Sequence, residues 1–321
     1  MRMRLRGALL MGVAVLALSS LVACAKFGQL KAMKAFKDAN TLYQQQEYKR
    51  AAALYEQAVA ADPNMGQAYF FLANSYDNLY KPSLKGQPDN DAYINKAVQD
   101  YRLAAQKLPT TDPTDAKLKK LALEYLVAAY GPDKLNDPNK SLPVVQQMIQ
   151  MEPSNPDNYF ALAKIYEDAG QYDLAEQTYL KAKQVKPDDP AVYLQLAGFY
   201  NRQGEFDKTI QALQERIQND PKNPEAYYTV ATYYWDKAYR DATLTNADKL
   251  GYVDKGIQAI DQALQIRPDY MEALVYKNLL LRLEANLIKD PKKQQELLKE
   301  ADKLRNEANE LRKKKAAGIG D

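Results

Sequence analysis

The sequence lacks the side chains on which most enzyme chemistry depends. It contains no histidine, so it offers no imidazole base, no Ser–His pair and no histidine metal ligand. No glycine-rich phosphate-binding loop is present. Asp89 and Asp91 stand in an oxygen-rich segment, but without the spacing of an EF-hand loop they are best explained as solvated acids. We therefore expect a protein that is not an enzyme and that holds no metal and no cofactor.

The one cysteine, Cys24, stands at the end of a leader-like segment. Three arginines come first, an uncharged run over residues 7–25 follows, and small residues precede the cysteine. This order is typical of a secretory signal peptide. The LVAC ending at residues 21–24 resembles the lipobox of bacterial lipoproteins, which implies that the thiol of Cys24 takes a diacylglycerol and that Cys24 becomes the first residue of the mature chain.

This resemblance predicts a signal peptide over residues 1–23 and a lipidated linker over 24–30. Ala25 is not the aspartate that retains lipoproteins in the inner membrane of enteric bacteria, so the resemblance favours the outer membrane over the inner one. The alternative is an uncleaved anchor, because the uncharged run has 19 residues and is just long enough to span a bilayer. Either reading places the remaining chain on the periplasmic side of the inner membrane.

The charge balance argues against a nucleic-acid partner. The chain has 44 lysines and arginines against 41 acids, and removing the three leader arginines leaves 41 against 41. Bulk nucleic-acid binding depends on neutralising many phosphates, for which a neutral chain is unsuited. No cysteine remains after Cys24, so disulfides cannot stabilise the fold and stacked hydrophobic faces must do so.

The middle of the sequence holds two amphipathic patterns that face each other across one glycine. Small and aromatic residues recur at the spacing of a helix face on either side of Gly170. Asn155-Pro156 is typical of a helix start, and Pro187 cannot continue a helix. The whole unit repeats after 34 residues. The repeated residues are Tyr159, Leu162, Ala163, Tyr166, Gly170, Tyr172 and Pro187, matched by Tyr193, Leu196, Ala197, Tyr200, Gly204, Phe206 and Pro221.

This unit resembles the tetratricopeptide repeat (TPR), a helix–turn–helix of about 34 residues. The resemblance implies an all-α fold, a right-handed superhelical solenoid of about six repeats with a helical C-terminal cap. The solenoid is predicted over residues 31–270, the cap over 271–315 and a disordered tail over 316–321. The predicted repeats are approximately 31–65, 66–110, 111–154, 155–188, 189–222 and 223–269.

Two insertions and a charged last helix depart from a uniform array. The insertions lie at residues 81–91 and 238–250, and insertions in a solenoid collect on surfaces that are often used. The last helix carries a narrow apolar stripe among many charges, which suits a terminal cap with a polar outer face. The alternative for this helix is docking to a partner.

The TPR resemblance places a binding groove on the first helices of the repeats. Core packing takes repeat positions 4, 8 and 11, and positions 5, 9 and 12 lie about 100° further round, on the groove face. An aromatic residue recurs at position 5. The groove residues predicted in this way are Phe36, Asn40 and Tyr43, Phe70, Asn74 and Asp77, Phe160, Lys164 and Glu167, Leu194, Gly198 and Asn201, and Tyr228, Thr232 and Trp235.

The composition of this predicted groove suits an extended peptide. Asparagine can pair with both the NH and the CO of an extended backbone, and aromatic side chains give contact area at low entropic cost. Trp235 is the only tryptophan and the best single hot-spot candidate. The alternative is that position 5 packs against the neighbouring first helix. Phe36 and Phe71 replace the lysine and second asparagine of carboxylate-clamp TPR modules, so that recognition mode is not expected.

We therefore expect a lipid-anchored scaffold or adaptor of the cell envelope that binds a protein or extended peptide in its groove. Outer-membrane protein, pilus, secretion and cell-wall assembly are all compatible with this form. One alternative is a module that binds a small ligand or glycan through the groove aromatics. The other is a hydrolase that brings two carboxylates together in space, for which no residue pair stands out.

Overall fold

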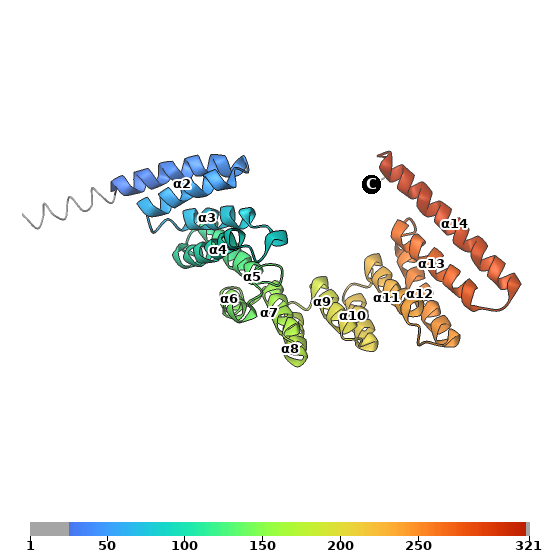
Figure 1. The fold of residues 1–321 in the computed structure, drawn as a ribbon. Helices are drawn as coiled ribbons and strands as arrows, with labels where there is room; N and C mark the ends of the chain where they lie inside the picture. Colours follow the sequence, from blue (N-terminus) through green and yellow to red (C-terminus); the bar gives the residue numbers. More distant parts are fainter. Residues whose placement is uncertain (1–25, 319–321) are drawn as a thin grey trace, which may run out of the picture. The chain divides into compact units, whose positions relative to one another are not determined.

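The structure is a computed structural model that describes residues 26–318. Within that range the chain forms α-helices and one short 3-10 helix joined by turns, without a strand (Figure 1). The fold is an all-α solenoid. The predicted signal peptide and the predicted lipidation site, Cys24, lie outside the described residues, as do residues 319–321.

The chain divides into two compact units, one ending at Tyr172 and the other beginning at Asp173. The boundary falls at the start of the second helix of repeat 4. The first unit contains a helix over residues 26–44, α2 (Tyr48–Ala61), α3 (Gly66–Leu79), the 3-10 helix η1 (Pro82–Leu84), α4 (Pro88–Lys107), α5 (Pro113–Ala129), α6 (Pro138–Met151) and α7 (Pro156–Asp168).

The second unit ends with two long helices that follow the sixth repeat. These two helices, α13 and α14, pack on each other through Leu274, Leu281 and Leu304. The helices of this unit are α8 (Tyr172–Val185), α9 (Pro190–Arg202), α10 (Phe206–Asn219), α11 (Pro224–Arg240), α12 (Asn246–Ile266), α13 (Met271–Leu287) and α14 (Pro291–Ala316).

The first helices of repeats 3 to 6 start at a short polar residue followed by proline. The Asn223 side chain accepts a hydrogen bond from the Glu225 backbone NH, and Asp189 caps α9 in the same way. Proline at the first helical position removes an NH that would have no partner there. Between paired helices Gly204 has a φ of 76°, a left-handed conformation that glycine adopts without strain.

A tyrosine near the start of the first helix ties consecutive repeats together. The hydroxyl of Tyr193 donates to the carbonyl of Pro187 at 2.7 Å, and Tyr159 donates to Pro153 at 2.9 Å. Tyr227 makes the same bond with the next closing proline at 3.1 Å. This bond occupies a carbonyl in the turn between repeats, which explains why tyrosine rather than phenylalanine recurs here.

The second tyrosine of the first helix joins a small charged cluster. The Tyr200 hydroxyl donates to Glu176 at 2.8 Å, and the ammonium group of Lys208 lies 3.2 Å from the same carboxylate. In the first unit Tyr76 donates to Glu56, and Lys96 lies over the Tyr76 ring at 4.7 Å. Burial raises the pKa of both tyrosines, and the neighbouring glutamates raise it further.

The structure shows what the predicted insertions and flanking segments contain. Residues 81–87 form a loop that includes η1, whereas residues 88–91 already belong to α4. The buried Asn90 side chain in the first turn of α4 accepts from the NH of Lys81 and donates to its carbonyl. Within the predicted insertion 238–250, α11 continues to Arg240 and α12 begins at Asn246, so residues 241–245 alone lie outside these helices. Residues 26–30, assigned to the linker, are helical, and α14 extends to Ala316. Within residues 26–318 no helix is both long and apolar enough to cross a membrane.

Candidate functional site

In the first unit the predicted groove asparagines are already paired with tyrosines of the same unit. The Tyr43 hydroxyl donates to the side-chain oxygen of Asn74 at 3.0 Å. Tyr55 donates to the side-chain oxygen of Asn40 at 2.6 Å. A backbone ligand would have to compete with both bonds for these acceptors.

The two predicted groove phenylalanines of this unit pack inside it. Phe36 is half-buried, and its ring lies 5.8 Å from that of Tyr55 and 6.0 Å from that of Phe71. Phe70 is only 4% exposed and its ring lies 6.3 Å from that of Tyr101. The expectation that Phe70 lines an open groove is thus wrong, because neighbouring aromatic rings cover it. The packing alternative for position 5 applies at this residue.

Asp77 is also engaged within the first unit. Its carboxylate accepts a hydrogen bond from the Tyr101 hydroxyl at 3.4 Å and forms an ion pair with Lys134, which lies in the turn before α6. Burial raises the pKa of Tyr101, and the Asp77 charge adds to that rise. The predicted residues of α3 therefore hold the first unit together.

The predicted residues of α7 differ in how far they are exposed to solvent. Phe160 is half-buried, and Lys164 is exposed and paired with Asp168 one turn along the same helix. Glu167 is only 9% exposed, which corrects its assignment to an open groove face. Exposed ion pairs within one helix contribute little binding or folding energy.

Three predicted residues of the second unit do come together. Asn201 from α9 and Thr232 and Trp235 from α11 line one open cavity of about 260 Å³. The cavity therefore uses position 12 of repeat 5 and positions 9 and 12 of repeat 6. Its other lining residues are Tyr233, Asp236, Arg240 and Tyr276.

Trp235 is the centre of an aromatic group at this cavity. Its ring stacks on that of Tyr239 with a centroid distance of 4.9 Å and an interplanar angle of 10°. Tyr276 from α13 meets the tryptophan edge-on at 5.8 Å. Tyr239 is 61% exposed, so this stacked pair presents apolar surface to solvent.

The aromatic contacts continue from Trp235 toward the start of α11. Tyr228 meets Tyr276 at 5.3 Å with perpendicular rings and lies 5.3 Å from Tyr270. Burial raises the pKa of Tyr228 to about 12, with Tyr276 and Tyr270 adding to the rise. We call Trp235, Tyr239, Tyr276, Tyr228 and Tyr270 the aromatic strip.

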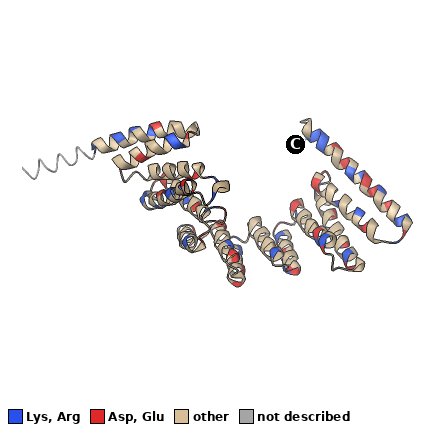
Figure 2. Ribbon diagram, in the orientation of Figure 1, with Lys and Arg blue, Asp and Glu red and all other residues tan. Residues whose placement is uncertain are grey.

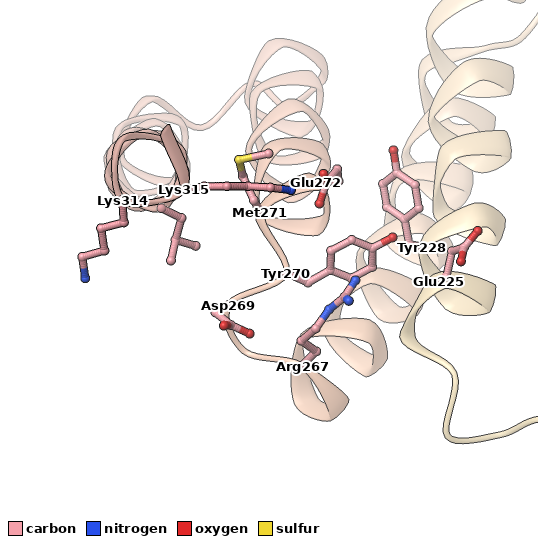
Figure 3. A pocket seen from close by; sticks show the side chains of 10 residues that line it. Glu225, Tyr228, Arg267, Asp269, Tyr270, Met271, Glu272, Lys314 and Lys315 are labelled. Carbon is pink, nitrogen blue, oxygen red and sulfur yellow. The ribbon is translucent and has the colours of Figure 1, made fainter. Parts of the chain in front are cut away.

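The far end of the aromatic strip borders a second, larger cavity of about 790 Å³ (Figure 3). Tyr228 comes from α11, Tyr270 from the turn before α13, and Lys314 and Lys315 from the end of α14. Lys315 extends toward the side of the cavity that carries Glu272, as Figure 3 shows. The remaining lining residues are Glu225, Arg267, Asp269, Met271 and Leu311.

Charges of both signs surround this larger cavity. The Arg267 guanidinium lies 3.6 Å from the centroid of the Tyr270 ring, a cation–π contact that holds it against the aromatic strip. Glu225 is within 3.7 Å of Arg216, so part of its charge is compensated. Polar groups at the rim of an aromatic surface can orient a ligand that the rings bind.

Leu194, the remaining predicted residue of the second unit, lies on α9 and is 36% exposed, outside both cavities. Near it, a methyl group added at Gly198 would lie 3.3 Å from the Arg202 guanidinium, so that arginine covers the groove position without a side chain. Within residues 26–318 no group of three acidic, cysteine or histidine side chains could hold a metal ion.

Sequence reasoning missed the groove residues of α13. Tyr276 contacts both Trp235 and Tyr228, whereas its helix is predicted from the sequence to belong to the C-terminal cap. The detectable signal was Pro268, which stands at the position of a closing proline. Continuing the repeat numbering past it would have placed Tyr276 at position 6, next to the groove positions.

Comparison with known proteins agrees with this architecture. Models described as tetratricopeptide repeat match residues 36–79, 134–197 and 190–232. These stretches of the chain are tetratricopeptide repeats. No curated protein matches the sequence.

Solved structures of TPR proteins align with the chain to different degrees. The C-terminal part of a TPR repeat-containing protein from Cytophaga hutchinsonii aligns with a TM-score of 0.54 at 16% identity, covering 86% of this chain and 98% of that one. A TPR protein from Parabacteroides merdae aligns at 0.46 and 15% identity, covering 85% and 99%. MamA from Desulfovibrio magneticus aligns at 0.37 and 14% identity, covering 60% and 95%. These likenesses concern the fold.

Proposed function

We propose that this protein is a lipid-anchored scaffold of the bacterial cell envelope that binds an extended segment of a protein partner along the aromatic strip. TPR solenoids act in protein–protein interaction, and the leader pattern ending at Cys24 supports export and anchoring. The outer membrane is favoured by Ala25. The protein acts by binding and not by catalysis.

The aromatic strip with a cavity at each end carries this proposal. Trp235 and Tyr276 border the smaller cavity, and Tyr228 and Tyr270 border the larger one. Rigid aromatic side chains give large contact areas at low entropic cost and dominate binding hot spots. A peptide lying across the strip could place side chains in both cavities.

The two units differ in how their predicted groove residues are paired, and this difference supports a binding surface in the second unit. In the first unit, groove acceptors such as Asn40 and Asn74 are paired with tyrosines, and Phe70 is covered. In the second unit Asn201 and Thr232 line an open cavity. Open, convergent polar and aromatic groups characterise a binding site, whereas paired and covered groups stabilise a fold. The partner segment therefore binds the second unit.

A crosslinked pull-down from native membranes tests the proposal. The wild-type chain is compared with a Tyr228→Ala, Trp235→Ala variant and with a control variant, Tyr172→Ala, Leu174→Ala, whose two side chains are 49% and 42% exposed on α8. Loss of one specific protein from the strip variant alone, with the helical fold intact by circular dichroism, is expected. If the same proteins are recovered with all three chains, the aromatic strip is not the binding surface.

A second candidate function rests on the stacked Trp235–Tyr239 pair. A flat, exposed aromatic face beside Asn201 and the Asp236–Arg240 pair could also bind a small ligand or glycan ring. Trp235 is the only tryptophan, so its fluorescence reports binding directly. Saturable quenching by an oligosaccharide, without a stable protein partner, would favour this function over the scaffold.

A further inference from the structure

The first helix of the described chain exposes large apolar side chains to solvent. Phe27, Leu30 and Met33 are 72%, 67% and 61% exposed. They are spaced by three residues along the helix over 26–44, so they lie along one side of it. Contiguous apolar exposure of this kind marks an interaction surface.

The opposite side of the same helix is fixed to the solenoid. Ala32 and Ala39 are completely buried. At Gly28 an added methyl group would lie 2.8 Å from the carbonyl oxygen of Ala61, so the helix start closely approaches the end of α2. Residues 26–33 are therefore held against the fold, and the direction in which the apolar side chains project is set by that packing.

Four lysines accompany the exposed apolar residues. Lys26, Lys31, Lys34 and Lys37 are all exposed, and the first acidic residue of this helix is the exposed Asp38, one turn after Lys34. Within the described part of the chain no carboxylate pairs with any of them. Each lies three or four residues from an exposed apolar side chain, so charge and apolar surface share one face. Figure 2 shows the positive charge along this helix.

This combination identifies one kind of partner. A second copy of the chain would bring four lysines against four lysines, which opposes association. An outer face that only capped a solenoid would be polar. An anionic bilayer surface suits both the exposed apolar side chains and the lysines. The apolar side chains enter the headgroup region. The lysine stems extend along that region, and their ammonium groups pair with lipid phosphates.

We propose that residues 26–37 form a membrane-contacting face that lies on the surface of an anionic bilayer. In the context of the proposed function, Cys24 stands two residues before Lys26, so its lipid would enter the same surface. One acyl anchor binds membranes weakly, and a basic face supplies the second signal needed for stable attachment. The face binds anionic vesicles even when no lipid is attached to the chain.

Vesicle co-sedimentation of residues 24–321 carrying Cys24→Ser tests this directly, because that chain contains every described helix and no lipid anchor. We expect binding to vesicles of equal parts phosphatidylglycerol and phosphatidylcholine, weak binding to phosphatidylcholine alone, and loss of binding in high salt. Equal binding to both vesicle types, or none to either, would overturn the proposal.

Two variants and a matched control assign the effect to this face. Replacing Lys26, Lys31, Lys34 and Lys37 by glutamine is expected to weaken binding by roughly fivefold per lysine. The Phe27→Ala, Leu30→Ala, Met33→Ala variant is expected to lose at least about tenfold. The control replaces four exposed lysines in and just before α14, and an equal loss there would contradict the assignment. The control positions are Lys289, Lys292, Lys299 and Lys303.

A fluorescent label locates the contact and separates this proposal from the lipid anchor. With Cys24→Ser the chain has no thiol, so Leu30→Cys accepts one environment-sensitive dye. Its emission is expected to shift to the blue with anionic vesicles, whereas a dye at Leu298→Cys on α14 should not respond. A shift with protein concentration alone, together with dimers in light scattering, would assign the face to a second copy. A failure of the proposed lipid anchor would be seen in a different experiment, because the chain would stay attached to membranes in cells after Cys24→Ser.

Discussion

A carboxyl group between α2, α3 and α4 makes the stability of the first unit depend on pH. Asp100 on α4 is half-buried, and burial raises its pKa from 3.8 to about 7. The carboxylate of Glu56 raises this pKa further and the ammonium of Lys96 lowers it. A negative charge at Asp100 therefore opposes folding, and Asp100→Asn removes it while keeping the shape.

Proton linkage gives the direction in which pH changes the stability of the first unit and the pH range over which it does so. The folded chain holds the Asp100 proton up to about pH 7, whereas the unfolded chain releases it near pH 4. The folded state binds more protons in between, so this group's destabilising effect grows as pH rises from about 4 to about 7 and is complete above it. At ~1.4 kcal/mol per pKa unit the limit is about 4 kcal/mol, and partial exposure reduces the expected cost to about 1–3 kcal/mol.

Urea denaturation of wild type and Asp100→Asn at pH 4.5 and pH 8 measures this cost. The variant should be more stable by about 1–3 kcal/mol at pH 8 and by about a quarter of that at pH 4.5. Asp133→Asn, at an exposed aspartate, controls for the loss of one charge. Equal stability of wild type and Asp100→Asn at pH 8, or a gain that does not change with pH, would refute this account of the cluster.

Four further substitutions test the packing. Gly204→Ala should lower the free energy of unfolding by about 1–2 kcal/mol in urea melts, because the φ of Gly204 is 76°. Gly251→Ala, in open space inside α12, should raise the free energy of unfolding by about 0.5–1 kcal/mol. A gain in stability at both positions would contradict the turn geometry. Tyr193→Phe should cost about 1 kcal/mol by losing the bond to Pro187, and no change would show that water replaces it. Arg216→Met should be neutral or stabilising in thermal melts, because the buried Nε of Arg216 has no partner among the described residues, and a large loss would assign that cation a structural role.

Local patterns in the sequence predict the helix pairs well. The Asn-Pro and Asp-Pro starts become capped helices because the side-chain oxygen and the missing NH act within one turn of chain. Gly170 and Gly204 adopt positive φ because the tight turn between paired helices requires it. These features depend on neighbours in sequence, which a periodic pattern displays directly.

The candidate site was harder to predict from the sequence than the helix pairs, because it depends on contacts between repeats. Repeat positions placed Phe70 on a groove face, but rings from α4 and α5 cover it. The same numbering singled out Trp235, which lines a cavity, yet it did not reveal that Tyr276 lines the same cavity. Tyrosine hydroxyl partners such as Pro187 were invisible for the same reason, since they depend on how one repeat docks on the next.

Site-specific photocrosslinking in cells tests the central claim most directly. A photoreactive phenylalanine analogue replaces Tyr239, which is 61% exposed beside Trp235, and a control chain carries it at Tyr172, which is 49% exposed on α8. One crosslinked partner protein is expected from position 239, lost on Trp235→Ala, and none from position 172. The same partner captured from position 172, or from position 239 regardless of Trp235→Ala, would contradict binding at the aromatic strip.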